Sequence, residues 1–249
     1  MSGRMTELRF HTMADGRRIA FRHTPAPADA PTLVFLPGYM SDMSGSKATA
    51  LFARAAAEGR GCLLLDYSGC GASSGDFAEG TLTRWRDEVL ALIAAHVAGP
   101  VLLVGSSMGG WLMLLVGEAL GERLCGLIGI AAAPDFTRWG YTAEQRDALA
   151  AGVTLFKPNP YGPEPTPTYA RFFADAEGHR RFGEPIPLAC PVRLIHGQRD
   201  EDVPWEISLK LAAALASDAV QVVLVKDGDH RLSRPQDIAA IEAAVAGLW

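Results

Sequence analysis

Short apolar runs rich in Val, Ile and Leu recur along the chain and mark its predicted strands. Six such runs lie at residues 32–38, 62–67, 101–106, 126–132, 192–197 and 220–228. Predominantly apolar runs of this length are typical of strands that are buried on both faces of a parallel sheet. Two earlier runs, Leu8–Met13 and Arg18–Thr24, are separated by Ala-Asp-Gly and predict an antiparallel hairpin.

Segments with the helical spacing of apolar residues follow most of these runs. They lie at residues 46–59, 82–97, 108–121, 206–217 and 235–248. Ser233 and Pro235 give the last of them a start signal, because proline suits the first turn of a helix. A hairpin followed by alternating strands and helices predicts the α/β class, with eight strands in a mostly parallel sheet and helices on both faces. We expect a single domain over residues 1–249.

Residues 134–190 interrupt this alternation after the sixth predicted strand. The segment is far longer than an ordinary connection, which spans about 2–6 residues. A disordered linker is disfavoured because seven aromatic side chains in the segment require burial. They are Trp139, Tyr141, Phe156, Tyr161, Tyr169, Phe172 and Phe173. We therefore expect a cap inserted into the domain.

The composition narrows the classes of protein that the chain can belong to. Hydrophobic residues make up 49% and charged residues 20%, which is typical of a globular protein. The net charge is −5 and Lys/Arg runs are short, so we expect no nucleic-acid partner. The charged N-terminus does not resemble a signal peptide, and no apolar stretch reaches membrane-spanning length. The four cysteines lack C-x-x-C spacing, so we expect free thiols and a cytoplasmic location. Because no apolar stretch is long enough, we expect no stable membrane insertion.

The chain contains the string Gly-x-Ser-x-Gly twice, around Ser73 and around Ser107. A nucleophile elbow is a sharp turn between a strand and a helix, where glycines remove clashes and the serine hydroxyl is exposed. Ser107 fits, since an apolar strand precedes it and a helical pattern follows. Ser73 lies in a glycine-interrupted loop and is expected to be a turn residue, and Ser106 lacks the flanking glycines. Ser107 is therefore the candidate nucleophile.

A serine nucleophile needs a base and an acid that orients the base. Of the six histidines, His230 lies between the final strand and the final helix, at the sheet edge predicted for Ser107. His196 falls inside a strand and is expected in the core. His11, His23, His96 and His179 fall on the hairpin, a helix and the cap. Asp200 is the candidate acid because it comes first after its strand, and Asp202 remains the alternative.

The remaining parts of the predicted site bind the oxyanion and the substrate. The oxyanion of an acyl-transfer reaction requires two N–H donors. We expect them from the backbone of Met108, after the nucleophile, and of Tyr39, after the tight turn at Gly38. An apolar substrate pocket is predicted from Met40, Phe156, Phe172, Val203 and Trp205. Trp111 is expected in the core. Asp42 and Lys47 are expected on a solvated loop face, with contact to a polar head group of the substrate as the alternative. We expect neither a metal nor a cofactor.

Several blocks of the chain, in this order, resemble the α/β-hydrolase domain-containing proteins. They are residues 35–48, 66–89, 103–115, 193–208 and 227–238, and the cap matches least well. The resemblance implies an α/β-hydrolase fold with Ser107 as nucleophile, Asp200 as acid and His230 as base. The separation of 30 residues between the last two favours Asp200 over Asp202. The resemblance also implies S-depalmitoylation or cleavage of acyl-glucuronides as the activity.

The sequence thus predicts a serine hydrolase that cleaves ester or thioester bonds of a small-molecule or acylated-protein substrate through an acyl-enzyme. The Ala-rich composition and the absence of a presequence favour a bacterial relative. Two alternatives stay open. One is a general carboxylesterase or a peptidase that acts on small amides, and the other is a non-catalytic receptor on the same fold. The sequence indicates no oligomeric state.

Overall fold

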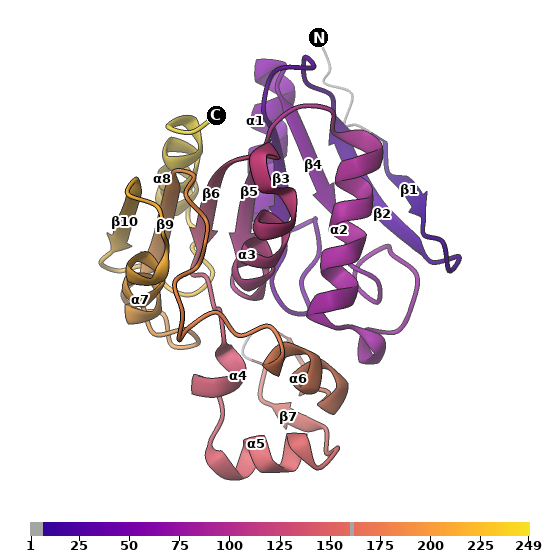
Figure 1. The fold of residues 1–249 in the computed structure, drawn as a ribbon, viewed down its shortest axis with the longest axis vertical. Coiled ribbons are helices and arrows are strands. Elements are labelled where there is room, and N and C mark those ends of the chain that lie inside the picture. The colour runs from indigo at the N-terminus through magenta and orange to yellow at the C-terminus, as the bar shows by residue number, and fades with distance from the viewer. Residues whose placement is uncertain (1–6, 160–161) are drawn as a thin grey trace.

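An eight-stranded sheet forms the centre of the molecule (Figure 1). The computed structural model describes residues 7–159 and 162–249. In spatial order the strands are β1 (Arg9–Thr12), β2 (Arg18–Thr24), β4 (Gly61–Leu65), β3 (Thr32–Leu36), β5 (Val101–Ser106), β6 (Leu124–Ile130), β9 (Val192–Gly197) and β10 (Val220–Val225). β2 pairs antiparallel with β1 and β4, and all other neighbours are parallel. The predicted mostly parallel sheet and its hairpin are confirmed.

Helices cover both faces of this sheet (Figure 1). They are α1 (Ser46–Glu58), α2 (Leu82–His96), α3 (Met108–Leu120), α7 (Glu206–Ala214) and α8 (Pro235–Ala246), with short 3-10 turns η1 (Phe77–Glu79) and η2 (Gly121–Arg123). Alternate side chains of each central strand point to opposite faces. In β3, Val34 and Leu36 pack in the core beneath α2 and α3, whereas Leu33 and Phe35 pack beneath α1 and α8. Both faces of the sheet are therefore buried.

Several element ends differ from the prediction by one to three residues, and local contacts explain two of these ends and the cap of the last helix. Leu215 has an extended backbone, and Ala216 donates a hydrogen bond of 2.9 Å to the carbonyl of Ile186, so α7 ends at Ala214 instead of residue 217. β10 ends at Val225 because Gly228 turns back to its carbonyl at 3.0 Å. α8 is capped from Arg234 rather than from Ser233, since the Asp237 carboxylate accepts the Arg234 N–H at 3.1 Å. Local hydrogen bonds determine where these elements begin and end, and the spacing of apolar residues does not predict such hydrogen bonds.

The segment between β6 and β9 folds at the carboxyl ends of the strands (Figure 1). It contains α4 (Phe136–Trp139), α5 (Ala143–Ala150), an antiparallel pair β7 (Leu155–Lys157) and β8 (Thr166–Thr168), and α6 (Ala170–Glu177). The predicted aromatic Tyr161 lies outside the described residues. Asp135 accepts the N–H groups of Arg181 and Phe182, each at 2.8 Å, and so joins the two ends of this cap segment (residues 134–190).

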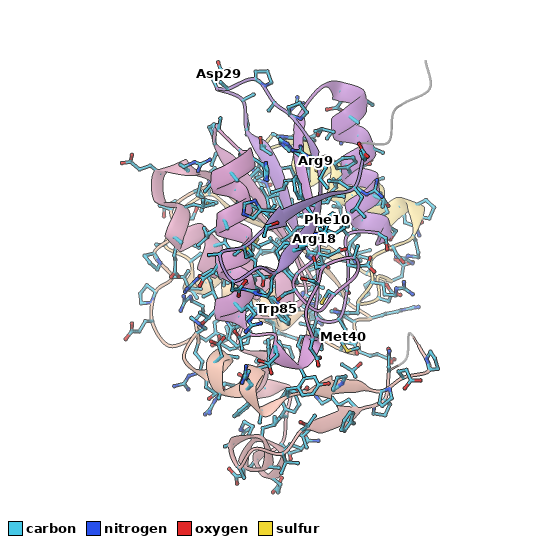
Figure 2. The ribbon with its side chains drawn as sticks, turned by 90° about the vertical axis from the view of Figure 1, so that its right-hand side faces the viewer. Arg9, Phe10, Arg18, Asp29, Met40 and Trp85 are labelled. Atoms are coloured by element: carbon cyan, nitrogen blue, oxygen red, sulfur yellow. The ribbon has the colours of Figure 1, made fainter. Side chains whose placement is uncertain are left out.

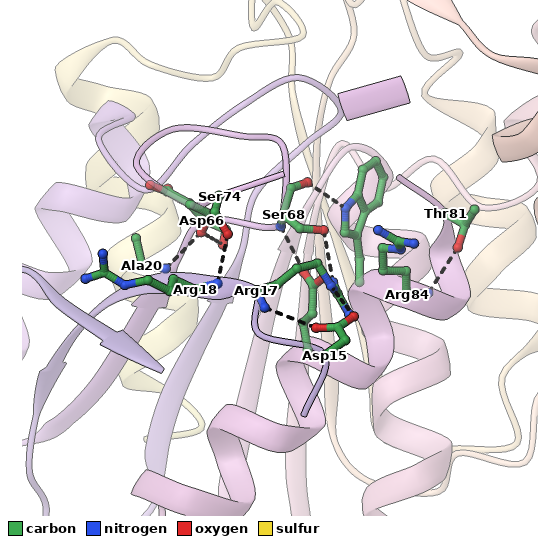
Figure 3. A network of polar contacts seen from close by, with 12 residues as sticks. Asp15, Arg17, Arg18, Ala20, Asp66, Ser68, Ser74, Thr81 and Arg84 are labelled. Carbon is green, nitrogen blue, oxygen red and sulfur yellow. Dashed lines mark hydrogen bonds and ion pairs between the residues drawn. The ribbon is translucent and has the colours of Figure 1, made fainter. Parts of the chain in front are cut away.

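A buried ion pair fastens the N-terminal hairpin to the rest of the sheet (Figure 3). Arg17 lies between β1 and β2, and its guanidinium bonds to the carboxylate of Glu88, which is fully buried on α2. The other carboxylate oxygen of Glu88 accepts the N–H of Ser68 at 2.9 Å, and the carbonyl of Ser68 accepts the Trp85 indole N–H at 3.2 Å. The hairpin, α2 and the loop after β4 are thereby held as one unit.

The helices bear on the expectation about membranes. Among the residues that the structure describes, every helix is too short or too polar to cross a bilayer. The four cysteines of the chain are free thiols, and Cys62 and Cys70 are buried.

Candidate active site

The backbone at Ser107 has the shape that the elbow prediction requires. Ser107 follows β5 directly and precedes α3, and its φ of 54° and ψ of −120° lie outside the regions that side chains favour. Such a conformation costs about 1–3 kcal/mol and must be imposed by its surroundings. A Cβ at Gly105 would lie 2.3 Å from the carbonyl oxygen of Gly109, and one at Gly109 would lie 2.1 Å from that of Leu36. A side chain at either flanking position would therefore collide with the backbone, so both positions require glycine.

His230 stands between the Ser107 hydroxyl and the Asp200 carboxylate. Its Nε2 lies 3.1 Å from Ser107 Oγ, and its Nδ1 lies 2.8 Å from Asp200 Oδ2. A carboxylate only accepts hydrogen bonds, so Nδ1 carries the proton. Nε2 is then free to accept the hydroxyl proton of Ser107. The loops after β5, β9 and β10 thus bring together the three residues that the sequence selects.

Asp200 is held as a carboxylate by four donors. Its Oδ1 accepts the backbone N–H groups of Asp202 at 2.9 Å and Val203 at 2.8 Å, and its Oδ2 accepts from His230 and His196. The Asp200 side chain is fully buried. Burial alone would raise the pKa of this carboxyl group, but the hydrogen bonds from His196 and His230 outweigh it and hold the pKa well below its usual range.

His196 is a partner of the acid that the sequence analysis did not identify. Its side chain is fully buried in β9, as expected, but its Nε2 lies 3.1 Å from Asp200 Oδ2 and 3.0 Å from the carbonyl of Val203. Both are acceptors, so Nε2 carries the proton, and Nδ1 accepts from the Ser208 hydroxyl at 2.7 Å. The spacing of four residues between His196 and Asp200 is the only sequence signal of this contact.

The lowered pKa of Asp200 predicts a pH dependence of stability. The unfolded carboxyl group titrates near its ordinary pKa of about 3.9, above the folded value. Its contribution is therefore fully present above about pH 4 and is lost as the pH falls toward the folded pKa. We expect the difference in unfolding free energy between the wild type and Asp200→Asn to shrink below about pH 4, by at most about 1.4 kcal/mol per pH unit. Urea unfolding between pH 7 and about 3 measures this, and a constant difference would contradict it.

The competing candidates lie elsewhere in the structure. Ser73 is tied into its loop, where its hydroxyl donates to the carbonyl of Asp66 at 2.6 Å and accepts from the N–H of Ala20 at 2.8 Å. Ser106 is the last residue of β5 and is buried. The side chain of Asp202 is exposed, while its backbone supports Asp200. Ser73 and Ser106 therefore do not occupy the position of Ser107, and the Asp202 carboxylate does not occupy the position of the Asp200 carboxylate.

A tight turn after β3, residues 38–41, lies against the nucleophile. The N–H of Ser41 donates to the carbonyl of Gly38 at 3.1 Å, and a Cβ at Gly38 would lie 3.3 Å from the Cβ of Ser107. Met40 has a φ of 55°, which a non-glycine residue adopts only under constraint. Its side chain is 45% exposed, at the end of the sheet that faces the cap segment (Figure 2).

Two polar contacts fix the ends of this 38–41 turn. The Tyr67 hydroxyl donates to the carbonyl of Pro37 at 3.1 Å, just before the turn. Asp66 Oδ1 accepts the N–H of Met43 at 2.7 Å, just after it, while Oδ2 accepts from Ala72 at 2.8 Å. Asp66 and Tyr67 belong to the loop after β4 that Figure 3 shows beside the hairpin. The position of the turn next to Ser107 therefore depends on this loop.

A cavity of about 250 Å³ opens beside the Ser107 hydroxyl. It lies between the loop after β3, the start of α1 and the loop after β10, and its walls include Tyr39, Asp42, Lys47, Ser107, His230 and Arg231. The Lys47 ammonium bonds to the carbonyl of Arg231, next to His230. Desolvation lowers the pKa of Lys47 to about 8. Charged side chains of both signs, Asp42, Lys47 and Arg231, therefore stand on this part of the cavity wall, beside apolar groups such as Phe35.

The five residues predicted to form an apolar pocket do not line this cavity. Phe172 is 1% exposed and packs in the core with Trp85, while Phe156 is 64% exposed on β7. Val203 is buried in a small cluster with Ile207 of α7, and Trp205 is the residue directly before that helix. Met40 turns its side chain to the surface. The prediction rested on apolar character, which does not tell which way a loop or cap side chain faces. Trp111 is buried, as expected.

Two carboxylates and one imidazole at the site lie close enough together to share a metal ion. Asp200, Asp202 and His230 each place a ligand atom within 4.8 Å of the others. A metal there would compete with the Asp200–His230 hydrogen bond, because Oδ2 and Nδ1 already face each other at 2.8 Å. The donor set therefore suits proton transfer better than it suits a metal.

Comparison with known proteins agrees with this geometry. Residues 33–241 match the profile of the alpha/beta hydrolase family. The mouse protein named palmitoyl-protein thioesterase ABHD10, mitochondrial, is 41% identical over 225 residues, which cover 88% of this chain and 75% of that protein. The chain belongs to the alpha/beta hydrolase family, and it is a hydrolytic enzyme.

Two solved structures are similar over nearly the whole chain. A putative hydrolase from Agrobacterium vitis S4 has a TM-score of 0.90 and 38% identity, covering 97% of this chain and 99% of that one. The mouse alpha/beta hydrolase domain-containing protein 10 has a TM-score of 0.90 and 36% identity, covering 98% of each chain. The eight-stranded sheet and the cap segment are thus parts of one shared fold.

Proposed function

We propose that Ser107, His230 and Asp200 form the catalytic triad of a serine hydrolase that cleaves acyl thioesters and esters. The observation that carries the proposal is the continuous series of hydrogen bonds from Ser107 Oγ through His230 to the buried Asp200 carboxylate. A serine hydroxyl becomes a nucleophile when a neutral imidazole accepts its proton. The series presents that imidazole in the required tautomer.

The reaction proceeds in two acyl-transfer steps. His230 Nε2 takes the Ser107 proton as Oγ attacks the substrate carbonyl, and the resulting oxyanion is bound by the N–H groups of Tyr39 and Met108. The protonated imidazole then gives its proton to the leaving thiolate or alkoxide. Water enters, loses a proton to His230 and attacks the acyl-enzyme, and the returning proton restores the Ser107 hydroxyl as the acid departs. The Asp200 carboxylate stabilises the imidazolium in both steps.

The substrate class rests on relatives and on the cavity. The curated relative with 41% identity is named a palmitoyl-protein thioesterase, which supports long-chain acyl thioesters. The cavity of about 250 Å³ is slightly smaller than most ligand sites, which span about 300–1,000 Å³, and its walls combine polar and apolar groups. A cavity of this size suits a short acyl group better than a long acyl chain. This observation favours a second candidate function, a carboxylesterase for short acyl groups.

Turnover of a substrate series distinguishes these two functions. The series contains p-nitrophenyl esters from acetyl to palmitoyl, palmitoyl-thioester peptide and an acyl-glucuronide, each assayed on the wild type. We expect kcat/KM to be highest for long-chain acyl groups and for the thioester. Each CH₂ group buried from water contributes about 0.8 kcal/mol, so kcat/KM should rise about fourfold per CH₂ while the chain is still being buried. Fastest turnover of the acetyl ester would replace the first function by the second.

The location and the partners of the protein follow from weaker signals. We place it in the cytoplasm because its thiols are free, while the curated relatives carry the word mitochondrial in their names. A small-molecule or acylated-protein substrate is its only proposed partner. Fractionation of the native host with antibody detection tests the location.

A further inference from the structure

Tyr39 contributes to two parts of the molecule at once. Its backbone belongs to the 38–41 turn beside Ser107, where we place one oxyanion donor. Its ring packs in an aromatic cluster, with centroid distances of 4.9 Å to Phe77 and 5.0 Å to Phe172. The ring of Trp85 lies 6.2 Å away. The position of the backbone N–H is thus tied to the packing of the ring.

Phe172 is the member of this cluster that comes from the cap segment. It lies on α6 and is 1% exposed, and its ring stacks on Phe136 of α4 at 5.7 Å and lies 5.8 Å from Trp85 of α2. Its ring meets Tyr39 at an angle of 64°, an edge-to-face arrangement that favours one ring orientation. The cap therefore supplies one wall of the site that holds the Tyr39 ring.

The 38–41 turn needs such support because its backbone is strained. Met40 holds a φ of 55°, although it is not glycine. Such a conformation persists where neighbouring contacts impose it. The Met40 side chain is 45% exposed, so the constraint comes from its neighbours, which include the hydrogen bonds at both ends of the turn and the partly buried ring of Tyr39 directly before Met40.

We propose that Phe172 is a positioning residue for the oxyanion hole: by packing on the Tyr39 ring, the cap segment holds the 38–41 turn in the conformation that points its N–H at the reacting carbonyl. The inference rests on the triad function proposed above. In this proposal the cap segment supports the oxyanion hole through Phe172, in addition to any role in binding the acyl group.

The proposal predicts which kinetic constant changes. A displaced N–H weakens binding of the oxyanion but not of the ground-state substrate, so the loss falls on kcat. Removing one oxyanion donor costs about 10²–10³-fold in kcat. Phe172→Ala leaves the donor present but loosens it, so we expect a kcat loss of roughly 10-fold, with KM within about twofold of the wild type. A trifluoromethyl ketone, whose adduct needs the oxyanion hole, should bind weaker by a similar factor.

The neighbouring phenylalanine provides a matched control. Phe173 lies on the same helix and is 5% exposed, but it packs in a separate cluster with Tyr141 and Leu149. Phe173→Ala removes the same atoms from the cap, so we expect a similar drop in Tm and an unchanged kcat. Phe172→Leu, which keeps most of the apolar volume, should recover part of the activity and serves if the alanine variant does not fold.

A second background tests the strain directly. Glycine adopts a φ of 55° without strain, so Met40→Gly should reduce the effect of Phe172→Ala on kcat. Equal kcat losses in Phe172→Ala and Phe173→Ala, a loss confined to KM, or an undiminished loss in the Met40→Gly background would each overturn the proposal. Fluorophosphonate labelling of the wild type is measured first. Failure of that labelling and of all ester turnover would overturn the triad function itself, whereas the variants decide the role of Phe172 alone.

Discussion

Ser107→Ala is expected to abolish turnover while the protein stays folded. The hydroxyl that His230 deprotonates is removed, and in a serine protease the loss of this group costs about 2 × 10⁶-fold in kcat. The N–H groups and the binding surface remain, so a residual rate of about 10³–10⁴ over water is expected. Two measurements check this prediction. Labelling by a fluorophosphonate probe, read on a gel, measures the loss of the nucleophile, and kcat for a p-nitrophenyl ester measures the loss of turnover.

The second Gly-x-Ser-x-Gly string supplies the control for this experiment. Ser73→Ala removes the hydrogen bonds to Ala20 and Asp66 and should cost about 1 kcal/mol of stability, but it should keep full labelling. Labelling that persists in Ser107→Ala would move the nucleophile to another residue. Labelling that is absent from the wild type would favour the receptor alternative.

Asp200→Asn is expected to lower kcat by about 10⁴-fold, with little change in the fold. The two backbone N–H groups at Oδ1 will hold the amide oxygen there, so the amide NH₂ must face His230 Nδ1. Nδ1 then becomes the acceptor and the proton moves to Nε2, which can no longer accept from Ser107. The amide also points at the Nε2–H of His196, which adds repulsion.

Asp202→Asn is the matched control, because its side chain is exposed and the substitution keeps the backbone N–H that donates to Asp200. We expect its kcat to stay within about threefold of the wild type. Steady-state kinetics with one ester substrate compares the two variants. If Asp202→Asn caused the larger loss, the acid of the triad would be Asp202.

The fold could be predicted because each central strand repeats one apolar pattern. Runs such as 101–106 are buried on both faces, and the hairpin turn at Ala14–Gly16 is a local signal. The elbow could be predicted as well, since strand, glycines and helix are consecutive in the chain. The catalytic roles stay predictions, although Ser107, His230 and Asp200 lie in one hydrogen-bonded series.

The contacts that depend on side-chain direction could not be predicted. The apolar ring of Phe172 predicts a place in the substrate pocket, yet the ring is buried against Tyr39 and Trp85. For His196 the pattern predicts a core position, and burial alone does not reveal that its Nε2 reaches Asp200. In both cases a residue of correct chemical character faces a partner outside its own helix or strand. Periodicity assigns burial along an element but does not assign the neighbour across a loop.

The ion pair between Arg17 and Glu88 makes the beginning of this chain a poor place for protein engineering. A truncation that starts at Ile19 would remove Arg17 and leave a carboxylate inside the core without its cation, a loss of about 3–5 kcal/mol. The disturbance would pass through Ser68 to Asp66, which anchors the end of the 38–41 turn. Libraries that shorten this enzyme should therefore spare its first hairpin.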